Sequence, residues 1–112
     1  MINHIIMFNL RGDLSEEERE SLLQEIPHAF GDLPTVENFR MGKAVKCSWK
    51  TSEPLYEFMF SMDFQDEQAL WRYLEDHREF SRNRFLTAVR EYLSLDVVIE
   101  DDKTQNKERM CK

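Results

Sequence analysis

The ten residues Leu55–Phe64, with the sequence LYEFMFSMDF, carry the clearest strand pattern of the chain. Consecutive side chains of a strand point to opposite faces of its sheet, so residues two apart share a face. One face would carry Tyr56, Phe58, Phe60, Met62 and Phe64. The other face would be mixed, with Leu55, Glu57, Met59, Ser61 and Asp63. The stretch therefore predicts a half-buried strand whose aromatic face covers a core.

Three further strands are expected around this one. Residues 2–10 alternate in the same way, with one face made of Ile2, His4, Ile6, Phe8 and Leu10. Residues 36–45 alternate more weakly, and Gly42 within them suggests a bulge or a close approach of another chain segment. The last strand covers residues 93–99, and its inner face is predicted to consist of Leu93, Leu95, Val97 and Ile99.

Helical patterns fill the intervals between these strands. Ser15 and Glu18 form a capping-box pattern that begins a helix, and Pro27 is expected to kink or split it. Residues 65–75 predict a second helix, and residues 77–93 predict a third. The side chains expected to be buried are Leu22, Leu23, Ile26, Ala29 and Phe30 in the first helix, Leu70, Tyr73 and Leu74 in the second, and Phe85, Leu86, Val89 and Leu93 in the third.

The resulting order, βαββααβ, is that of an α+β, ferredoxin-like domain with an antiparallel four-stranded sheet covered by helices on one face. This domain would span residues 1–100, and the polar residues 101–112 would form a disordered tail. Several apolar side chains remain for the second sheet face: Ile5, Met7, Leu55, Met59 and Val98. A homodimer stacked through its sheets, forming a dimeric α/β barrel, would bury them.

Composition excludes several classes of partner. The chain has 112 residues and a formal net charge of −7, which argues against nucleic acid and anionic membrane surfaces. No apolar run is long enough to span a membrane. Its two cysteines, Cys47 and Cys111, form no disulfide framework or zinc motif, so we expect a cytoplasmic protein with no metal. Gly-rich phosphate loops are also missing, and we expect no cofactor.

Several motifs resemble the stress-responsive A/B barrel family, the dimeric α/β-barrel (Dabb) proteins. The segment Asn3–Phe8, followed by Ser15–Glu18, is similar to the opening of that family. The segment Val36–Val45 resembles its second strand, and Leu70–Leu74 and Leu93–Glu100 resemble its second helix and closing strand. The resemblance covers residues 1–100 and implies a ferredoxin-like protomer in a homodimer.

The resemblance leaves two functions open. Many members look like stress-induced proteins without assigned chemistry, whereas a plant member is a cofactor-free polyketide cyclase. The cyclase-type site combines a His on the first strand with a Y-x-x-H-P-x-H segment, and His4 and Tyr73 match its first His and its Tyr. Asp76 and Glu79 stand at the two His positions of the segment, and His77 stands at its Pro.

The candidate catalytic residues are therefore His4, Tyr73 and His77. His4 could act as a general base or be a buried histidine that is merely hydrogen-bonded. Tyr73 could hold an oxyanion or be a core aromatic, and His77 could share its helix face or lie exposed in a first helical turn capped by Asp76. A pocket for a small apolar, aromatic or polyketide-like molecule would be lined by Ile6, Phe8, Phe58, Phe60 and Leu70. The alternative is a non-catalytic stress-response or interaction protein that acts as a stable homodimer.

Overall fold

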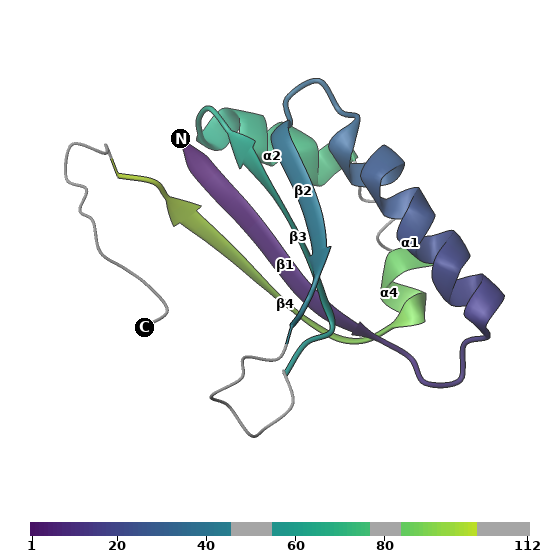
Figure 1. The fold of residues 1–112 in the computed structure, drawn as a ribbon. Coiled ribbons are helices and arrows are strands. Elements are labelled where there is room, and N and C mark those ends of the chain that lie inside the picture. Colours follow the sequence, from purple (N-terminus) through teal and green to yellow (C-terminus); the bar gives the residue numbers. More distant parts are fainter. Residues whose placement is uncertain (46–54, 77–83, 101–112) are drawn as a thin grey trace.

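The computed structural model describes residues 1–45, 55–76 and 84–100 of the chain. These residues form a four-stranded antiparallel sheet with the strand order β2-β3-β1-β4. The helices gather on one side of this sheet (Figure 1). The elements in chain order are β1 (Ile2–Leu10), α1 (Glu16–Gly31), β2 (Glu37–Lys43), β3 (Phe58–Phe64), α2 (Glu67–Asp76), α4 (Leu86–Ala88) and β4 (Val89–Val98). The order and the sheet confirm the predicted α+β, ferredoxin-like fold.

The core lies between the sheet and the helices and is largely aromatic. Phe8 and Phe60 from the sheet are completely buried, and so is Phe30 from α1. The ring centroids of Phe30 and Phe60 are 4.9 Å apart, and those of Phe8 and Phe85 are 5.1 Å apart. Aromatic pairs at such distances stabilise a core by more than the burial of their apolar surface alone would. The aromatic face predicted for Phe58–Phe64 is therefore confirmed as the core face.

Helix α1 begins as the sequence indicates. The Ser15 side chain accepts a hydrogen bond from the Glu18 backbone amide at 3.1 Å, and the Glu18 carboxylate accepts one from the Ser15 amide at 2.8 Å. The predicted split at Pro27 does not occur, because α1 runs unbroken to Gly31. A proline removes one helical donor, and the burial of Ile26 and Phe30 on either side of it holds the last turns on the sheet.

The irregular point of β2 is not Gly42. Gly42 pairs with Met59 in an unbroken register, and a Cβ atom built on it would meet nothing within 4 Å. The register shift lies between Glu37 and Arg40, where Asn38 has a φ of 54°. Asparagine tolerates this left-handed conformation better than most residues, and the Asn38 amide donates to Asp63 at 3.0 Å. The predicted bulge or close approach at Gly42 is therefore wrong.

The predicted third helix is also wrong over its last residues. Strand β4 already begins at Val89 and pairs with β1 from Leu10↔Val89 to Ile2↔Val98. Pairing along a whole strand outweighs a local helical pattern. Phe85 and Val89 are buried as predicted, whereas Leu86 and Leu93 are exposed. Residues 77–83 of that predicted helix, and the predicted tail at 101–112, lie outside the described residues.

Strand β4 has the opposite phase to the predicted one. Leu93 pairs with Met7, Leu95 with Ile5 and Val97 with Asn3, so all three lie on the sheet face away from the helices. Val98, predicted for that outer face, pairs with Ile2 and lies on the helix side. The outer face of the strands is therefore more apolar than predicted, with Ile5, Met7, Met59, Leu93, Leu95 and Val97.

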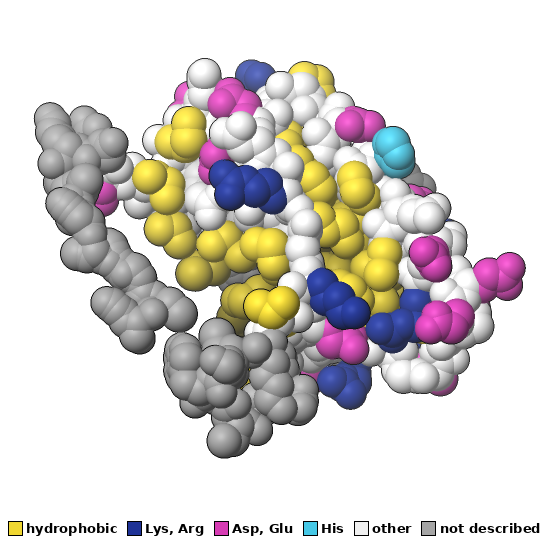
Figure 2. Space-filling model, in the orientation of Figure 1, with side chains coloured by type: hydrophobic (Ala, Val, Ile, Leu, Met, Phe, Trp, Pro, Cys, Tyr) yellow, Lys and Arg dark blue, Asp and Glu magenta, His cyan; other side chains and the backbone are white. Residues whose placement is uncertain are grey.

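Leu93 and Leu95 on this outer face are 48% and 50% exposed, respectively. The strands lie in front of α2 in the view of Figure 1, and Figure 2, in the same orientation, shows hydrophobic side chains gathered over them. Contiguous apolar surface of this kind marks an interaction site more often than isolated exposed residues do.

Candidate functional site

His4 is the buried polar residue at the centre of the candidate site. It lies on β1 between its register neighbours Met62 of β3 and Asp96 of β4, and it is 3% exposed. The alternation of β1 turns its side chain toward the helices, as the sequence predicts. A polar ring in such a place must be hydrogen-bonded or carry a cost in stability.

Asp96 supplies that hydrogen bond. His4 Nδ1 lies 2.5 Å from Asp96 Oδ1. When the imidazole is neutral, a carboxylate at this distance holds the proton on Nδ1, so that Nε2 carries the free electron pair. His4 Nε2 is buried and has no hydrogen-bond partner among the described residues. The arrangement is that of an oriented base, with Asp96 fixing the ring and Nε2 available to accept a proton.

Tyr73 of α2 lies against the same ring. Its side chain is completely buried, and its ring centroid is 5.5 Å from that of His4 with an interplanar angle of 66°. Phe64 packs against both rings, with its centroid 5.0 Å from that of Tyr73 and 6.3 Å from that of His4. Burial, and secondarily the negative charge of Asp96, raise the pKa of the Tyr73 hydroxyl far above its ordinary value. Tyr73 is therefore a neutral hydrogen-bond donor rather than a phenolate.

The structure thus brings two of the three predicted catalytic residues together. His4 and Tyr73 converge from the first strand and the second helix, whereas His77 lies outside the described residues. Asp96 was missed by the sequence reasoning. A charged residue between the apolar residues Leu95 and Val97 of a strand is unusual enough to suggest a functional role. Its position opposite His4, however, depends on the pairing of two strands whose facing residues are 92 positions apart in the sequence.

The residues predicted to line a pocket belong to the core side of the sheet. Phe8 and Phe60 are completely buried, Ile6 and Leu70 are nearly so, and Phe58 is partly buried against them. Three hollows of the described surface lie elsewhere, with volumes of about 560, 340 and 450 Å³. None of the five residues lines one of these hollows, and their contact with a ligand stays a prediction.

The described residues show two further absences. No group of three or more His, Cys, Asp or Glu side chains within them is placed to hold a metal ion. None of their helices is both long and apolar enough to cross a membrane.

Comparisons with known proteins place the chain in a family. The model of the stress-responsive A/B barrel domain (Dabb) matches residues 2–99. No curated protein sequence matches the chain.

Among solved structures, a Dabb family protein with a ferredoxin-like fold from Mesorhizobium loti is 26% identical, with a TM-score of 0.76 over 89% of this chain and 97% of that chain. A hydroxynitrile lyase from Passiflora edulis is 13% identical, with a TM-score of 0.76 over 89% and 94%. A dimeric ferredoxin-like protein from Thermobifida fusca is 16% identical, with a TM-score of 0.69 over 88% and 90%. The two structures below 25% identity show the shared fold alone. The family model spans nearly the whole chain, and the protein belongs to the stress-responsive A/B barrel domain family.

Proposed function

We propose that the protein is a homodimer in which each protomer binds a small apolar, aromatic or polyketide-like molecule and acts on it by acid–base chemistry without a cofactor. The observation that carries this proposal is the contact of the buried His4 with Asp96, whose side chain is 41% exposed; this 2.5 Å contact leaves Nε2 of His4 as an acceptor beside Tyr73. The absence of a disulfide framework also favours the cytoplasm as its place of action.

The roles follow from the geometry. His4 Nε2 takes a proton from a carbon next to a substrate carbonyl, and Asp96 stabilises the imidazolium that forms. The Tyr73 hydroxyl donates a hydrogen bond to the carbonyl oxygen as negative charge develops on it. The enolate is then reprotonated by the imidazolium, or it attacks a second carbonyl of the same molecule, whose oxygen takes the proton back from the imidazolium. Each step moves a proton or an electron pair within the substrate and these side chains.

Hydrogen–deuterium exchange tests this chemistry directly. The probe is 2,4-dihydroxyacetophenone, a neutral aromatic ketone whose methyl protons are exchanged for deuterium in D₂O when a base forms the enolate. We expect the wild-type dimer to accelerate this exchange above the buffer rate, as followed by ¹H NMR. His4→Ala and Tyr73→Phe should each lose about 10²-fold or more of the acceleration, the usual contribution of a general acid or base.

The Asp96→Asn variant tests whether His4 must be held in one tautomer and orientation, in addition to being present. An amide can donate to Nδ1 and so place the imidazole proton on Nε2, which removes the acceptor. The exchange rate should therefore fall while His4 is retained. Wild-type protein that neither binds the ketone nor accelerates its exchange would overturn the enzymatic proposal for this substrate class.

The homodimer rests on the apolar outer face of the sheet. The Thermobifida fusca protein, which shares the fold, is described as dimeric. Light scattering at micromolar concentration should give twice the protomer mass of 13.5 kDa. Leu95→Asp, on the outer face of the edge strand β4, should yield monomers, whereas Leu86→Asp, an exposed residue on α4, should not. A monomeric wild-type protein would contradict the proposal.

A non-catalytic homodimer is the second candidate. It is favoured by the complete burial of Phe8, Phe60 and Tyr73, and by the position of the three described hollows away from them. A dimer that shows no exchange activity and no ketone binding would support this function.

A further inference from the structure

A second feature of the molecule, separate from His4, is a hollow of about 450 Å³ at the end of the sheet where β1 finishes. Asn9 lies in its wall, five residues along β1 from His4, which corresponds to about 17 Å along an extended strand. The proposed acid–base site does not use this hollow.

Three cationic side chains line it and come from three different elements. Arg19 belongs to α1, Lys43 to β2 and Arg90 to β4. Among the described residues that line the hollow, only Glu57 carries a carboxylate. The lining side chains therefore carry an excess of positive charge in a chain whose formal net charge is −7. Such a local excess creates a binding potential for anions.

The three cations are weakly engaged within the described part of the chain. Arg19 Nη2 lies 3.7 Å from Glu57 Oε1, too far for a hydrogen bond, although the Arg19 side chain is only 29% exposed. Arg90 Nη2 lies 3.4 Å from Glu91 Oε2, its neighbour in sequence, and the Lys43 ammonium makes no ion pair with a described residue. Guanidinium groups form their strong hydrogen bonds at 2.7–2.9 Å and often in pairs. As far as the described residues are concerned, the donors of these three cations are thus available to an anion that enters the hollow.

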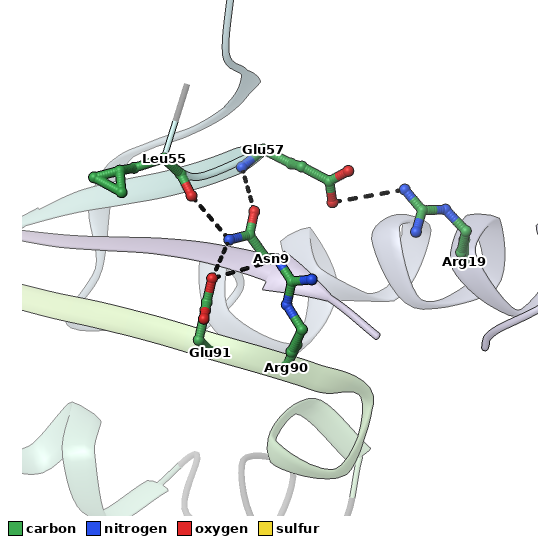
Figure 3. Close-up of polar contacts among 6 residues, drawn as sticks. All are labelled: Asn9, Arg19, Leu55, Glu57, Arg90 and Glu91. Atoms are coloured by element: carbon green, nitrogen blue, oxygen red, sulfur yellow. Dashed lines mark hydrogen bonds and ion pairs between the residues drawn. The ribbon is translucent and has the colours of Figure 1, made fainter. Parts of the chain in front are cut away.

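Asn9 holds the hollow together and is not itself free to bind. Its Nδ2 donates to the Leu55 carbonyl at 2.9 Å and to Glu91 Oε2 at 2.7 Å, and its Oδ1 accepts from the Glu57 amide at 2.7 Å. Figure 3 shows Asn9 between the segment of Leu55 and Glu57 and the strand that carries Arg90 and Glu91. This amide therefore ties the walls of the hollow to one another, and it shares Glu91 Oε2 with Arg90.

We propose that this hollow binds a small organic anion, whose carboxylate or phosphate group is held by Arg19, Lys43 and Arg90. The apolar part of the ligand lies against Leu55 and Tyr56, which line the same hollow. Leu55 is 78% exposed, so a ligand there would remove apolar surface from water.

Titration of the full-length, ¹⁵N-labelled protein with three probes tests this inference. Benzoate and phenyl phosphate carry the two candidate anionic groups on the same ring, and benzamide is the neutral counterpart of benzoate. We expect saturable shifts of the backbone amides of Gly12, Ala44 and Leu55 with at least one anion and none with benzamide. The tighter of the two anions identifies the carboxylate or the phosphate as the preferred group.

Charge-neutralising variants identify the cations. Arg19→Gln and Arg90→Gln should each weaken binding about tenfold or more, because each removes charge-assisted hydrogen bonds. Arg72→Gln removes the same charge from α2, outside this hollow, and should change the affinity less than twofold. Amide spectra of each variant show whether it is folded.

Three outcomes would overturn the proposal. They are the absence of saturable shifts with either anion in the wild-type protein, binding that survives in the Arg19→Gln/Arg90→Gln double variant, and equal weakening by Arg72→Gln. The wild-type titration decides the matter even if a variant fails to fold. Because the readout uses amides around the hollow, its result is independent of whether His4 catalyses proton transfer.

Discussion

Replacement of Asn9 by alanine should test how the described fold is held together at the end of the sheet. Asn9 is 3% exposed and uses all of its amide hydrogen-bonding groups. It connects β1 with the segment before β3 and with β4, which are far apart in sequence. Asn9→Ala removes these links and leaves the Leu55 carbonyl and the Glu57 amide without their side-chain partner.

The expected loss of stability follows from these contacts. Two hydrogen bonds join neutral groups, each worth a net contribution of about 1 kcal/mol, and the bond to the Glu91 carboxylate is worth about 2 kcal/mol. Leu55 and Glu57 are exposed as residues, so water replaces part of what is lost. We therefore expect Asn9→Ala to lower the free energy of unfolding by about 3 kcal/mol rather than by the full sum.

Urea denaturation measures this loss, and Asn3→Ala is the matched control. Asn3 is on the same strand and the same face, but it is only partly buried, and its amide donates to Met62 O at 3.3 Å and to Asp63 Oδ1 at 2.9 Å. Asp63 also accepts from Asn38 at 3.0 Å and keeps that bond in the variant. We expect Asn3→Ala to cost less than Asn9→Ala, because it removes one hydrogen bond fewer from a side chain that is only partly buried.

Both variants must be compared with the wild type at several equal protomer concentrations, since a dimer's stability depends on concentration. If Asn9→Ala costs no more than Asn3→Ala, the network around Asn9 neither stabilises the fold nor fixes the walls of the hollow.

Two further predictions use other parts of the core. A Cβ atom on Gly31 would lie 2.9 Å from Cγ of Phe39, so Gly31→Ala should lower stability by about 1–2 kcal/mol in thermal denaturation. Gly12→Ala, whose Cβ would meet nothing within 4 Å, should change it by less than about 0.5 kcal/mol, and equal effects of the two would contradict the packing described. Tyr73 should remain protonated at alkaline pH, because burial and the charge of Asp96 raise its pKa. The absorbance titration of Tyr73→Phe should therefore match that of the wild type until the protein unfolds, and loss of a titration step below that pH would be inconsistent with a buried hydroxyl.

Strong local patterns made much of the fold predictable. The alternation around Phe58–Phe64 and along Ile2–Leu10 predicts strands because apolar side chains at every second residue line one face of a strand, whereas in a helix they would spread around it. The cap at Ser15 predicts the start of α1 because it pairs two otherwise unsatisfied amides with two side chains. In each of these segments, the local preference and the tertiary contacts agree.

Predictions failed where the decision depends on distant contacts. The residues of β4 support either a helix or a strand, and only pairing with β1 decides between them. Asp96 could not be assigned to the site for the same reason, since its distance from His4 depends on the register between two strands that are paired in the sheet but lie near opposite ends of the sequence. Tyr73 could be assigned beside His4 because the family resemblance supplied both residues together.

The inverted phase of β4 links the two parts of the proposed function. An edge strand that merely completed the core would turn its apolar side chains toward the helices, but β4 turns Leu93 and Leu95 outward and Asp96 inward. On the core side, Asp96 keeps 41% of its side chain exposed, while its Oδ1 meets the buried His4. Leucines on the outer side cost free energy unless a surface covers them, and a second copy of the sheet would do so. The alternation of side chains along β4 thus supplies both the carboxylate that orients His4 and the leucines of the apolar outer face. A variant chain in which residues 93–97 are shifted by one position should lose the dimer and the proton-exchange activity together.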